Sequence, residues 1–142
     1  MRLCLPIFII CLAGCSDNRS FEVINDTIPS PLTSGVFDVE NGKKLFSSRG
    51  DAHCVICHSH NDVEVGFQGN LGPDLTRVQD RLSEGQIRLR IVDYDRVVPG
   101  TTMPSYFRIH DFNQVPTDKK GETILTAKEI EDIIAFLTHE DR

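Results

Sequence analysis

Several features that define common protein classes are scarce in this chain of 142 residues. Its main apolar stretch, residues 3–12, is shorter than the roughly 20 residues that a helix needs to span a bilayer. The formal net charge is −6, which argues against nucleic-acid binding, although solubility alone also explains an acidic surface. One Cys-x-x-Cys pair is present, at Cys54 and Cys57, so a four-ligand zinc site could be completed nearby only by His53 and His60.

One short motif determines how the rest of the chain is interpreted. Cys54 and Cys57 are three positions apart, and His58 follows directly. At this spacing two thiols reach the two vinyl groups on one edge of a haem, and the next side chain lies beneath the iron as its proximal ligand. A thioredoxin-type dithiol shares the spacing but follows a β-strand, and no strand-like run precedes Cys54. The motif therefore predicts a c-type cytochrome with one covalently bound haem c.

The N-terminus has the pattern of an export signal. Arg2 gives a minimal positive start, residues 3–12 are apolar, and residues 12–15 (LAGC) resemble a bacterial lipobox, whose cysteine is acylated and becomes the first mature residue. We expect a lipoprotein-type signal peptide at residues 1–14 and a lipid anchor at Cys15, which would hold the protein to a membrane in the periplasm. An ordinary cleaved signal that happens to end near a cysteine is the alternative.

These assignments use every cysteine of the chain. Cys4 and Cys11 leave with the signal, Cys15 takes lipid, and the motif pair takes haem, so no free thiol and no disulfide remains. Residues 15–36 are polar and proline-containing, which predicts a flexible tether. Residues 37–142 are then expected to form the cytochrome c domain.

The fold class predicted for this domain is all-α. Apolar residues at helical spacing indicate a helix over residues 38–48, in which Gly42 indicates a close helix crossing. Capping boxes at Ser83 and Thr126 begin two further helices, the first of which ends near Asp93. We expect a small cytochrome c-like domain of three to four helices, with long loops around one covalent haem.

Met103 is the only methionine that remains once the signal is removed. It lies in a loop bracketed by prolines, which is a poor place for a core-filling helix residue and a suitable one for presenting a thioether to iron. We therefore predict His58 and Met103 as the axial ligands, a pair that favours electron transfer. His110 is the main alternative to Met103.

Several other residues carry weaker expectations. The ring of His58 needs an acceptor for its second nitrogen, and the carbonyl of Pro73 is the candidate, although its segment is equally consistent with a plain turn. On the last helix, Glu131 and Asp132 are expected to face solvent. Surface positions are also expected for His53, His60 and His139. Three aromatic residues either flank the haem or fill a small core: Phe67, Tyr106 and Phe107.

Four further stretches carry a resemblance to a known family. They are residues 69–75 (GNLGPDL), 82–93 (LSEGQIRLRIVD), 102–106 (TMPSY) and 124–132 (ILTAKEIED). In their order and spacing they resemble SoxX, the monohaem c-type subunit of the SoxAX complex of thiosulfate oxidation, over nearly the whole domain. The resemblance implies haem thioethers at Cys54 and Cys57, with His58 and Met103 as axial ligands.

The resemblance also implies partners. A SoxA-like haem subunit would join thiosulfate oxidatively to a cysteine of a carrier protein, the reaction of an L-cysteine S-thiosulfotransferase, and this chain would pass the released electrons to a small acceptor cytochrome. Catalysis would then reside on the partner, because a haem with two protein ligands has no open coordination position. The lipobox is a departure, since many relatives are soluble in the periplasm. A stand-alone, membrane-anchored electron-transfer cytochrome serving an oxidase or reductase is the alternative.

Overall fold

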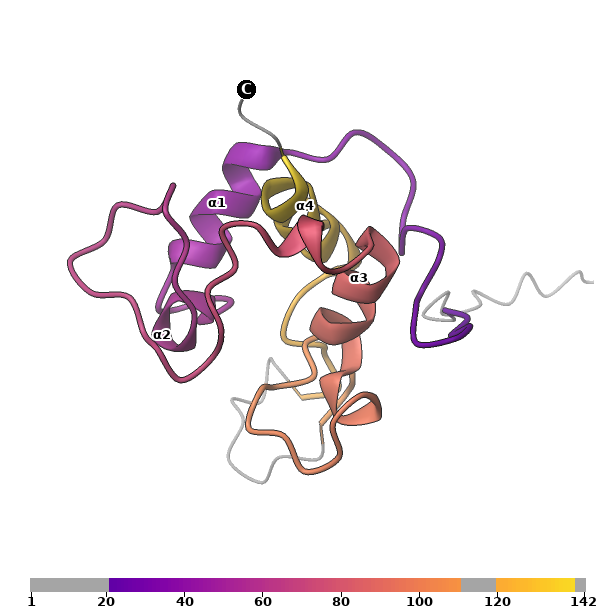
Figure 1. The fold of residues 1–142 in the computed structure, drawn as a ribbon. Coiled ribbons are helices and arrows are strands. Elements are labelled where there is room, and N and C mark those ends of the chain that lie inside the picture. Colours follow the sequence, from indigo (N-terminus) through magenta and orange to yellow (C-terminus); the bar gives the residue numbers. More distant parts are fainter. Residues whose placement is uncertain (1–20, 111–119, 140–142) are drawn as a thin grey trace, which may run out of the picture.

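The computed structural model describes residues 21–110 and 120–139, and all regular structure in these ranges is helical (Figure 1). In chain order the elements are α1 (Val39–Ser47), α2 (Cys54–Cys57), the 3₁₀ helix η1 (Val78–Asp80), α3 (Glu84–Asp93), the 3₁₀ helix η2 (Tyr94–Arg96) and α4 (Ala127–Thr138). The all-α prediction is confirmed, and the motif itself adds α2 to the three predicted helices. No helix in the described part of the chain is long and apolar enough to cross a membrane.

The three longer helices begin where their capping residues predict. Asp38 caps α1 through its side chain, and the capping boxes of α3 and α4 are both complete, at Ser83 with Gln86 and at Thr126 with Glu129. In each box the side chains satisfy backbone N–H groups that have no partner within the helix. The first turns of α3 and α4 are therefore specified by local sequence.

Helices α1 and α4 cross closely at Gly42, as predicted (Figure 1). A Cβ atom added to Gly42 would overlap the backbone carbonyl of Asp132 and would lie 2.9 Å from the Cβ of Phe136. The missing side chain thus lets two helix backbones touch, which offsets the cost of about 1 kcal/mol that a glycine brings to a helix interior. Buried apolar side chains on both helices, including Phe46 and Ile130, form the core beside this crossing.

Asp132 is buried, contrary to the prediction of a solvated acidic face, and its side chain is 0% exposed. It accepts hydrogen bonds from the backbone N–H of Asp38 at 2.8 Å, from Nδ2 of Asn41 at 2.8 Å and from Nζ of Lys128. Burial acts to raise the pKa of Asp132, but these hydrogen bonds outweigh it and hold the pKa below its ordinary value. The carboxylate therefore joins the start of α1 to α4.

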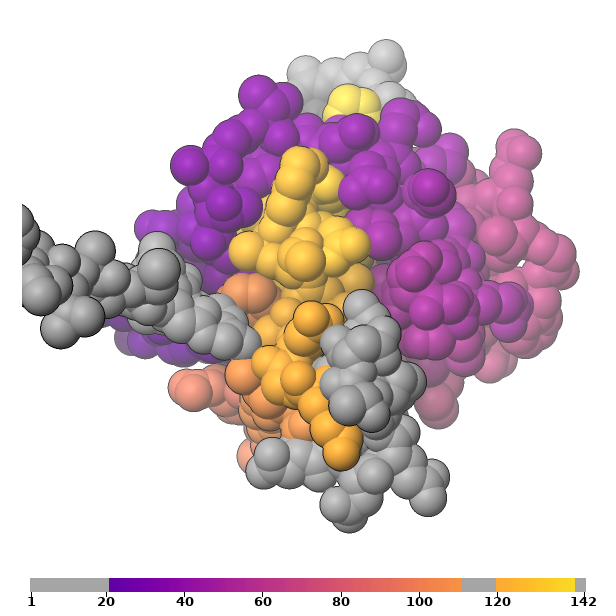
Figure 2. All heavy atoms as spheres, turned by 180° about the vertical axis from the view of Figure 1, so that it is seen from behind, coloured from indigo at the N-terminus to yellow at the C-terminus, as the bar shows by residue number. Residues whose placement is uncertain are grey.

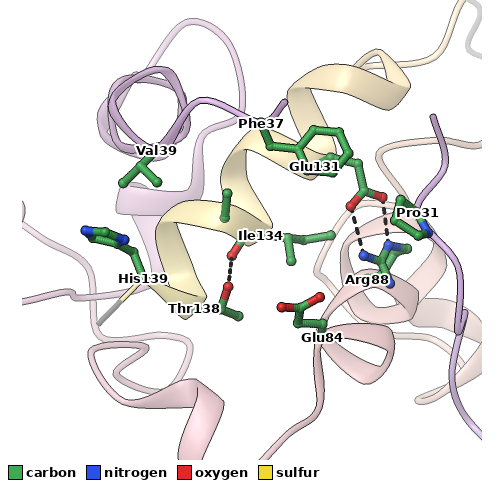
Figure 3. A pocket seen from close by; sticks show the side chains of 10 residues that line it. Pro31, Phe37, Val39, Glu84, Arg88, Glu131, Ile134, Thr138 and His139 are labelled. Carbon is green, nitrogen blue, oxygen red and sulfur yellow. Dashed lines mark hydrogen bonds and ion pairs between the residues drawn. The ribbon is translucent and has the colours of Figure 1, made fainter. Parts of the chain in front are cut away.

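Glu131 is also buried rather than solvated, because it pairs with Arg88 of α3 (Figure 3). The two side chains are 1% and 2% exposed, and the guanidinium donates to both carboxylate oxygens, at 2.7 and 2.8 Å. A bidentate geometry of this kind compensates much of the cost of desolvating both charges. The pair connects α3 to α4 across 43 residues of sequence.

The same ion pair holds the N-terminal segment, residues 21–37, against the domain. Arg88 donates to the carbonyl of Ile28 at 2.9 Å, and Glu131 accepts from the N–H of Leu32 at 2.9 Å. Ile28 is 2% exposed, and its N–H donates to the carbonyl of Gly85 at 3.0 Å. Residues 21–36, which the sequence predicts as part of a flexible tether, are thus packed against the domain, and Figure 2 shows the indigo N-terminal residues beside the yellow C-terminal helix.

His60 is buried instead of lying at the surface, with 2% exposure. Its ring lies between Phe46 and Phe136, with centroid distances of 5.9 and 4.6 Å. Nδ1 accepts a hydrogen bond from the N–H of Asp62 at 3.2 Å, and burial lowers the pKa of the imidazole. His60 thus behaves as an aromatic core residue, while His53 and His139 are exposed as predicted.

Candidate functional site

The Cys-x-x-Cys-His motif forms a single helical turn, α2, with the histidine at its end. Residues three apart lie on the same face of a helix, so Cys54 and Cys57 are presented on one side of the turn. His58 leaves the helix with an extended backbone, φ −114° and ψ 148°, while its N–H still donates to the carbonyl of Cys54 at 2.9 Å. The backbone thus turns sharply between the second thiol and the imidazole.

The imidazole of His58 is oriented by the backbone of a later loop. Its Nδ1 lies 2.8 Å from the carbonyl oxygen of Pro73. Because a carbonyl only accepts, this contact selects the tautomer in which Nδ1 carries the proton and donates. Nε2 then has a free lone pair, which is the arrangement of a metal-ligating histidine.

Two glycines let the loop of residues 69–75 lie directly on α2. The N–H of Gly69 donates to the carbonyl of Val55 at 2.9 Å, and the N–H of Gly72 donates to that of Cys57 at 2.8 Å. A Cβ atom on Gly69 would overlap the carbonyl of Ile56, and one on Gly72 would overlap the imidazole of His58. No side chain larger than hydrogen fits at either position, and the sequence signal for this is the Gly-x-x-Gly spacing.

The same loop is tied to the motif by polar side chains that the sequence did not single out. Asp74 accepts from the hydroxyl of Ser59 at 2.6 Å and from the N–H of Thr76 at 3.0 Å. Hydrogen bonds from Ser59 and then Thr76 hold the pKa of Asp74 below its ordinary value. Leu75 adds a backbone bond to Ser59 at 2.9 Å, so the residue after His58 is fixed from two sides.

The environment of Cys54 is unlike that of a redox dithiol. Burial raises its pKa to about 12, a backbone hydrogen bond opposes the rise, and the neighbouring Cys57 adds to it. A thioredoxin-type thiol needs the opposite shift, because the thiolate is the reacting species. Both cysteines are only partly buried, so a haem could reach both sulfur atoms to form thioethers.

Met103 lies in a loop that returns to the core after η2. Its side chain is partly buried and packs against the apolar core, and its N–H donates to the hydroxyl of Thr101 at 3.2 Å. Before it, Gly100 adopts φ 78°, a left-handed conformation that favours glycine, and its N–H donates to Asp95 at 2.9 Å. The loop therefore has a defined turn rather than a free course.

Tyr106 connects the loop of Met103 to the cysteine turn. Its hydroxyl donates to the carbonyl of Ala52 at 2.5 Å, two residues before Cys54, and its side chain is 4% exposed. Burial raises the pKa of Tyr106, and negative charge at Cys54 and Cys57 would raise it further. The structure thus brings the methionine loop and the motif together through one buried tyrosine.

Four other residues were named from the sequence: His110, Phe107, Phe67 and Cys15. His110, the alternative ligand, has its Nε2 within 2.6 Å of the carbonyl oxygen of Ser105. Phe107 packs against the core, whereas Phe67 is 66% exposed. Cys15 lies outside the described residues.

The residues present fit a covalently attached haem. Two thiols lie on one face of a helical turn, and the imidazole of His58 follows that turn with the lone pair of Nε2 available. Gly72 has no side chain that would displace this imidazole. Among the described residues, no group of three His, Cys, Asp or Glu side chains could hold a bare metal ion. Two thiols and one imidazole at this spacing suit an iron porphyrin, which brings its own four nitrogen ligands.

Comparison with known proteins agrees with this chemistry. The cytochrome c family model matches residues 39–140. A chain of the crystal structure of SoxXA from P. pantotrophus is similar, with a TM-score of 0.72 and 28% sequence identity, over 84% of this chain and 93% of that chain. No curated protein sequence matches the chain.

The fold, the motif and the family match together define a c-type cytochrome. The chain belongs to the cytochrome c family and carries one covalent haem c. Within that family its structure is similar to that of SoxXA. The protein is therefore an electron carrier.

Proposed function

We propose that this protein is the SoxX-like monohaem subunit of a SoxAX-type L-cysteine S-thiosulfotransferase. The observation that carries the proposal is the similarity to a SoxXA chain, which extends over 93% of that chain at 28% identity. A match of that extent favours a relative of the same overall build over a cytochrome that shares only the haem motif. The four sequence stretches described above support the same assignment.

In this proposal each site residue has one role. Cys54 and Cys57 form the thioethers, His58 and Met103 are the axial ligands, and the carbonyl of Pro73 orients the imidazole through Nδ1. The haem supplies reversible one-electron chemistry, and a methionine ligand raises its reduction potential. With both axial positions taken by side chains, small molecules have no place to bind, so the chain transfers electrons and does not bind thiosulfate.

Catalysis in this proposal belongs to a partner. A SoxA-like haem subunit would form the bond between a thiosulfate sulfur and the cysteine sulfur of a carrier protein, releasing the thiol proton and electrons. This chain would accept those electrons one at a time and pass them to a small acceptor cytochrome. Its partners are thus the haem subunit, the carrier protein through the complex, and the acceptor.

The location proposed is the periplasm, with a lipid anchor at Cys15 holding the domain near a membrane. Two or more acyl chains are needed for stable anchoring, which is what a bacterial lipoprotein cysteine carries. Mass spectrometry of the mature N-terminus tests this, and the expected result is a triacylated or diacylated Cys15. An unmodified terminus at another residue would remove the anchor from the proposal and leave the haem chemistry untouched.

A kinetic experiment separates the proposal from the stand-alone carrier. Purified holoprotein is mixed with thiosulfate and a carrier protein, with and without a SoxA-like subunit, and haem reduction is followed optically. We expect thiosulfate-dependent reduction only with the partner present, together with co-elution of the two chains. If the partner neither binds nor changes the rate, the subunit role is wrong and a carrier serving an oxidase or reductase remains.

A further inference from the structure

The loop that contains Met103, residues 97–110, folds back onto the C-terminal end of α3. The N–H groups of Tyr106 and Phe107 donate to the carbonyls of Ile91 and Val92, at 3.1 and 3.2 Å. These carbonyls belong to the last turn of α3, where helix geometry leaves them without an intrahelical partner. The second half of the loop thus uses the end of a helix as its support.

The side chain of Asp93, the last residue of α3, binds several residues of the chain that follows the helix. It is 7% exposed and accepts from the hydroxyl of Ser105 at 2.5 Å and from Nε of Arg96 at 3.2 Å. Nη1 of Arg108 lies 3.6 Å from the carboxylate. Ser105 is itself 3% exposed, so its bond to Asp93 is shielded from water.

Asp93 does not stabilise its own helix. The C-terminal end of a helix carries partial negative charge, so a carboxylate there is electrostatically unfavourable. The donors that compensate it, on Arg96, Ser105 and Arg108, all come from residues after the helix. The carboxylate therefore serves the loop that follows.

Ser105 is two residues from Met103, and the residue between them is Pro104. Proline fixes its own φ and restricts the residue before it, so the short chain from Met103 to Ser105 has little freedom. The carbonyl of Ser105 also lies 2.6 Å from Nε2 of His110. Ser105 is therefore held through both its side chain and its carbonyl, and this restricts the position of the Met103 backbone.

We propose that Asp93 is a positioning residue for the Met103 thioether and acts through its buried hydrogen bond to Ser105. This inference rests on the proposed role of Met103 as an iron ligand. Holding the loop raises the effective concentration of the sulfur at the iron, which disfavours its replacement by an external ligand. Loss of the hydrogen bond lowers that effective concentration without changing the ligand itself.

The test is an optical titration of the ferric holoprotein with imidazole, which competes with the methionine for iron. Asp93→Ala is expected to bind imidazole about tenfold more tightly than the wild type, the factor that one charge-assisted hydrogen bond of ordinary strength represents. Ser105→Ala removes the same bond with the loss of one oxygen atom, so the test does not depend on how well Asp93→Ala folds. The variant that carries both substitutions is expected to bind imidazole no more tightly than Asp93→Ala alone, because both changes remove the same hydrogen bond.

The matched control is Asp132→Ala, which removes a buried carboxylate that accepts from Asp38, Asn41 and Lys128 and has no hydrogen bond to the loop. It should lower the melting temperature and leave the imidazole affinity as in the wild type. An unchanged affinity in Asp93→Ala and Ser105→Ala, or an equal increase in Asp132→Ala, overturns the positioning role alone. A wild-type ferric spectrum without the weak long-wavelength band of methionine ligation overturns the ligand assignment, and Asp93 loses its role with it.

Discussion

The Nδ1 atom of His58 lies 2.8 Å from the carbonyl oxygen of Pro73, a residue 15 positions later in the chain. The hydrogen bond fixes both the tautomer and the rotation of the ring, and in the proposed haem site a carbonyl acceptor would make the imidazole a better donor to iron than a free one. Gly72, next to Pro73, is the residue whose lack of a side chain makes this approach possible.

Gly72→Ala should therefore disturb the proximal side of the haem. The added Cβ would overlap the imidazole of His58, so either the ring or the loop must move. We expect a lower yield of holoprotein and a shifted reduction potential in the fraction that matures, measured by haem staining and by redox titration. The control is Gly66→Ala, where a Cβ has open space around it and no change is expected. Equal behaviour of the two variants would contradict the role of Gly72.

Met103→His should retain the covalent haem and lower its reduction potential. Exchange of a thioether for an imidazole removes the ligand that favours ferrous iron, and we expect a decrease on the order of 0.1 V or more within the range of about 0.8 V that axial ligands span. Spectroelectrochemistry measures the potential, and loss of the methionine band confirms the exchange. A visible spectrum identical to that of the wild type would rule out Met103 as a ligand. His110→Ala, by contrast, should leave the methionine band in place.

Removing one partner of the buried ion pair between Arg88 and Glu131 should strongly lower the stability of the fold. Glu131→Ala leaves the guanidinium buried with its bidentate partner gone, and we expect a loss of about 3–5 kcal/mol in the free energy of unfolding. Denaturant unfolding of the holoprotein measures this. The control is Asp80→Ala, which breaks the exposed ion pair with Arg77 and should cost less than about 1 kcal/mol. Similar losses in the two variants would show that the buried pair is not structurally important.

Asp132 predicts a specific acid dependence of stability. Its pKa in the folded protein lies below the unfolded value of about 3.9, so it stabilises the fold above that pH and loses this contribution as the pH falls through the folded-state pKa. Asp132→Asn should be less stable than the wild type at pH 7 and lose less stability on acidification. Unfolding midpoints in urea, measured in steps from about pH 6 to pH 2, give both curves. Parallel curves would contradict the assignment.

Local sequence signals predicted the helices well, because capping and periodicity act within a few residues. Ser83 and Thr126 marked the starts of α3 and α4, and Gly42 marked the crossing of α1 with α4. The motif is likewise local, because Cys54, Cys57 and His58 lie within five residues, and the structure places both cysteines on one helical turn with His58 at its end.

The predictions failed where a residue's surroundings come from distant parts of the chain. Glu131 has the composition of a solvated helix face, and only its pairing with Arg88, 43 residues earlier, explains why it is buried. His60 follows the same rule, because its aromatic neighbours Phe46 and Phe136 belong to α1 and α4. The burial of Asp93 could not be predicted either, because its partner Ser105 becomes a neighbour only when the loop folds back onto α3.

The attachment of Ile28 and Leu32 to the ion pair has a consequence for how the domain moves if Cys15 is lipidated. Phe21 also contacts Phe107, with ring centroids 6.4 Å apart, so the distance from the anchor to the packed chain is set by residues 15–21, which at full extension reach roughly 20 Å. The haem domain would then be confined to a thin layer beside the bilayer. It would meet soluble electron donors and acceptors within that layer instead of diffusing through the whole compartment.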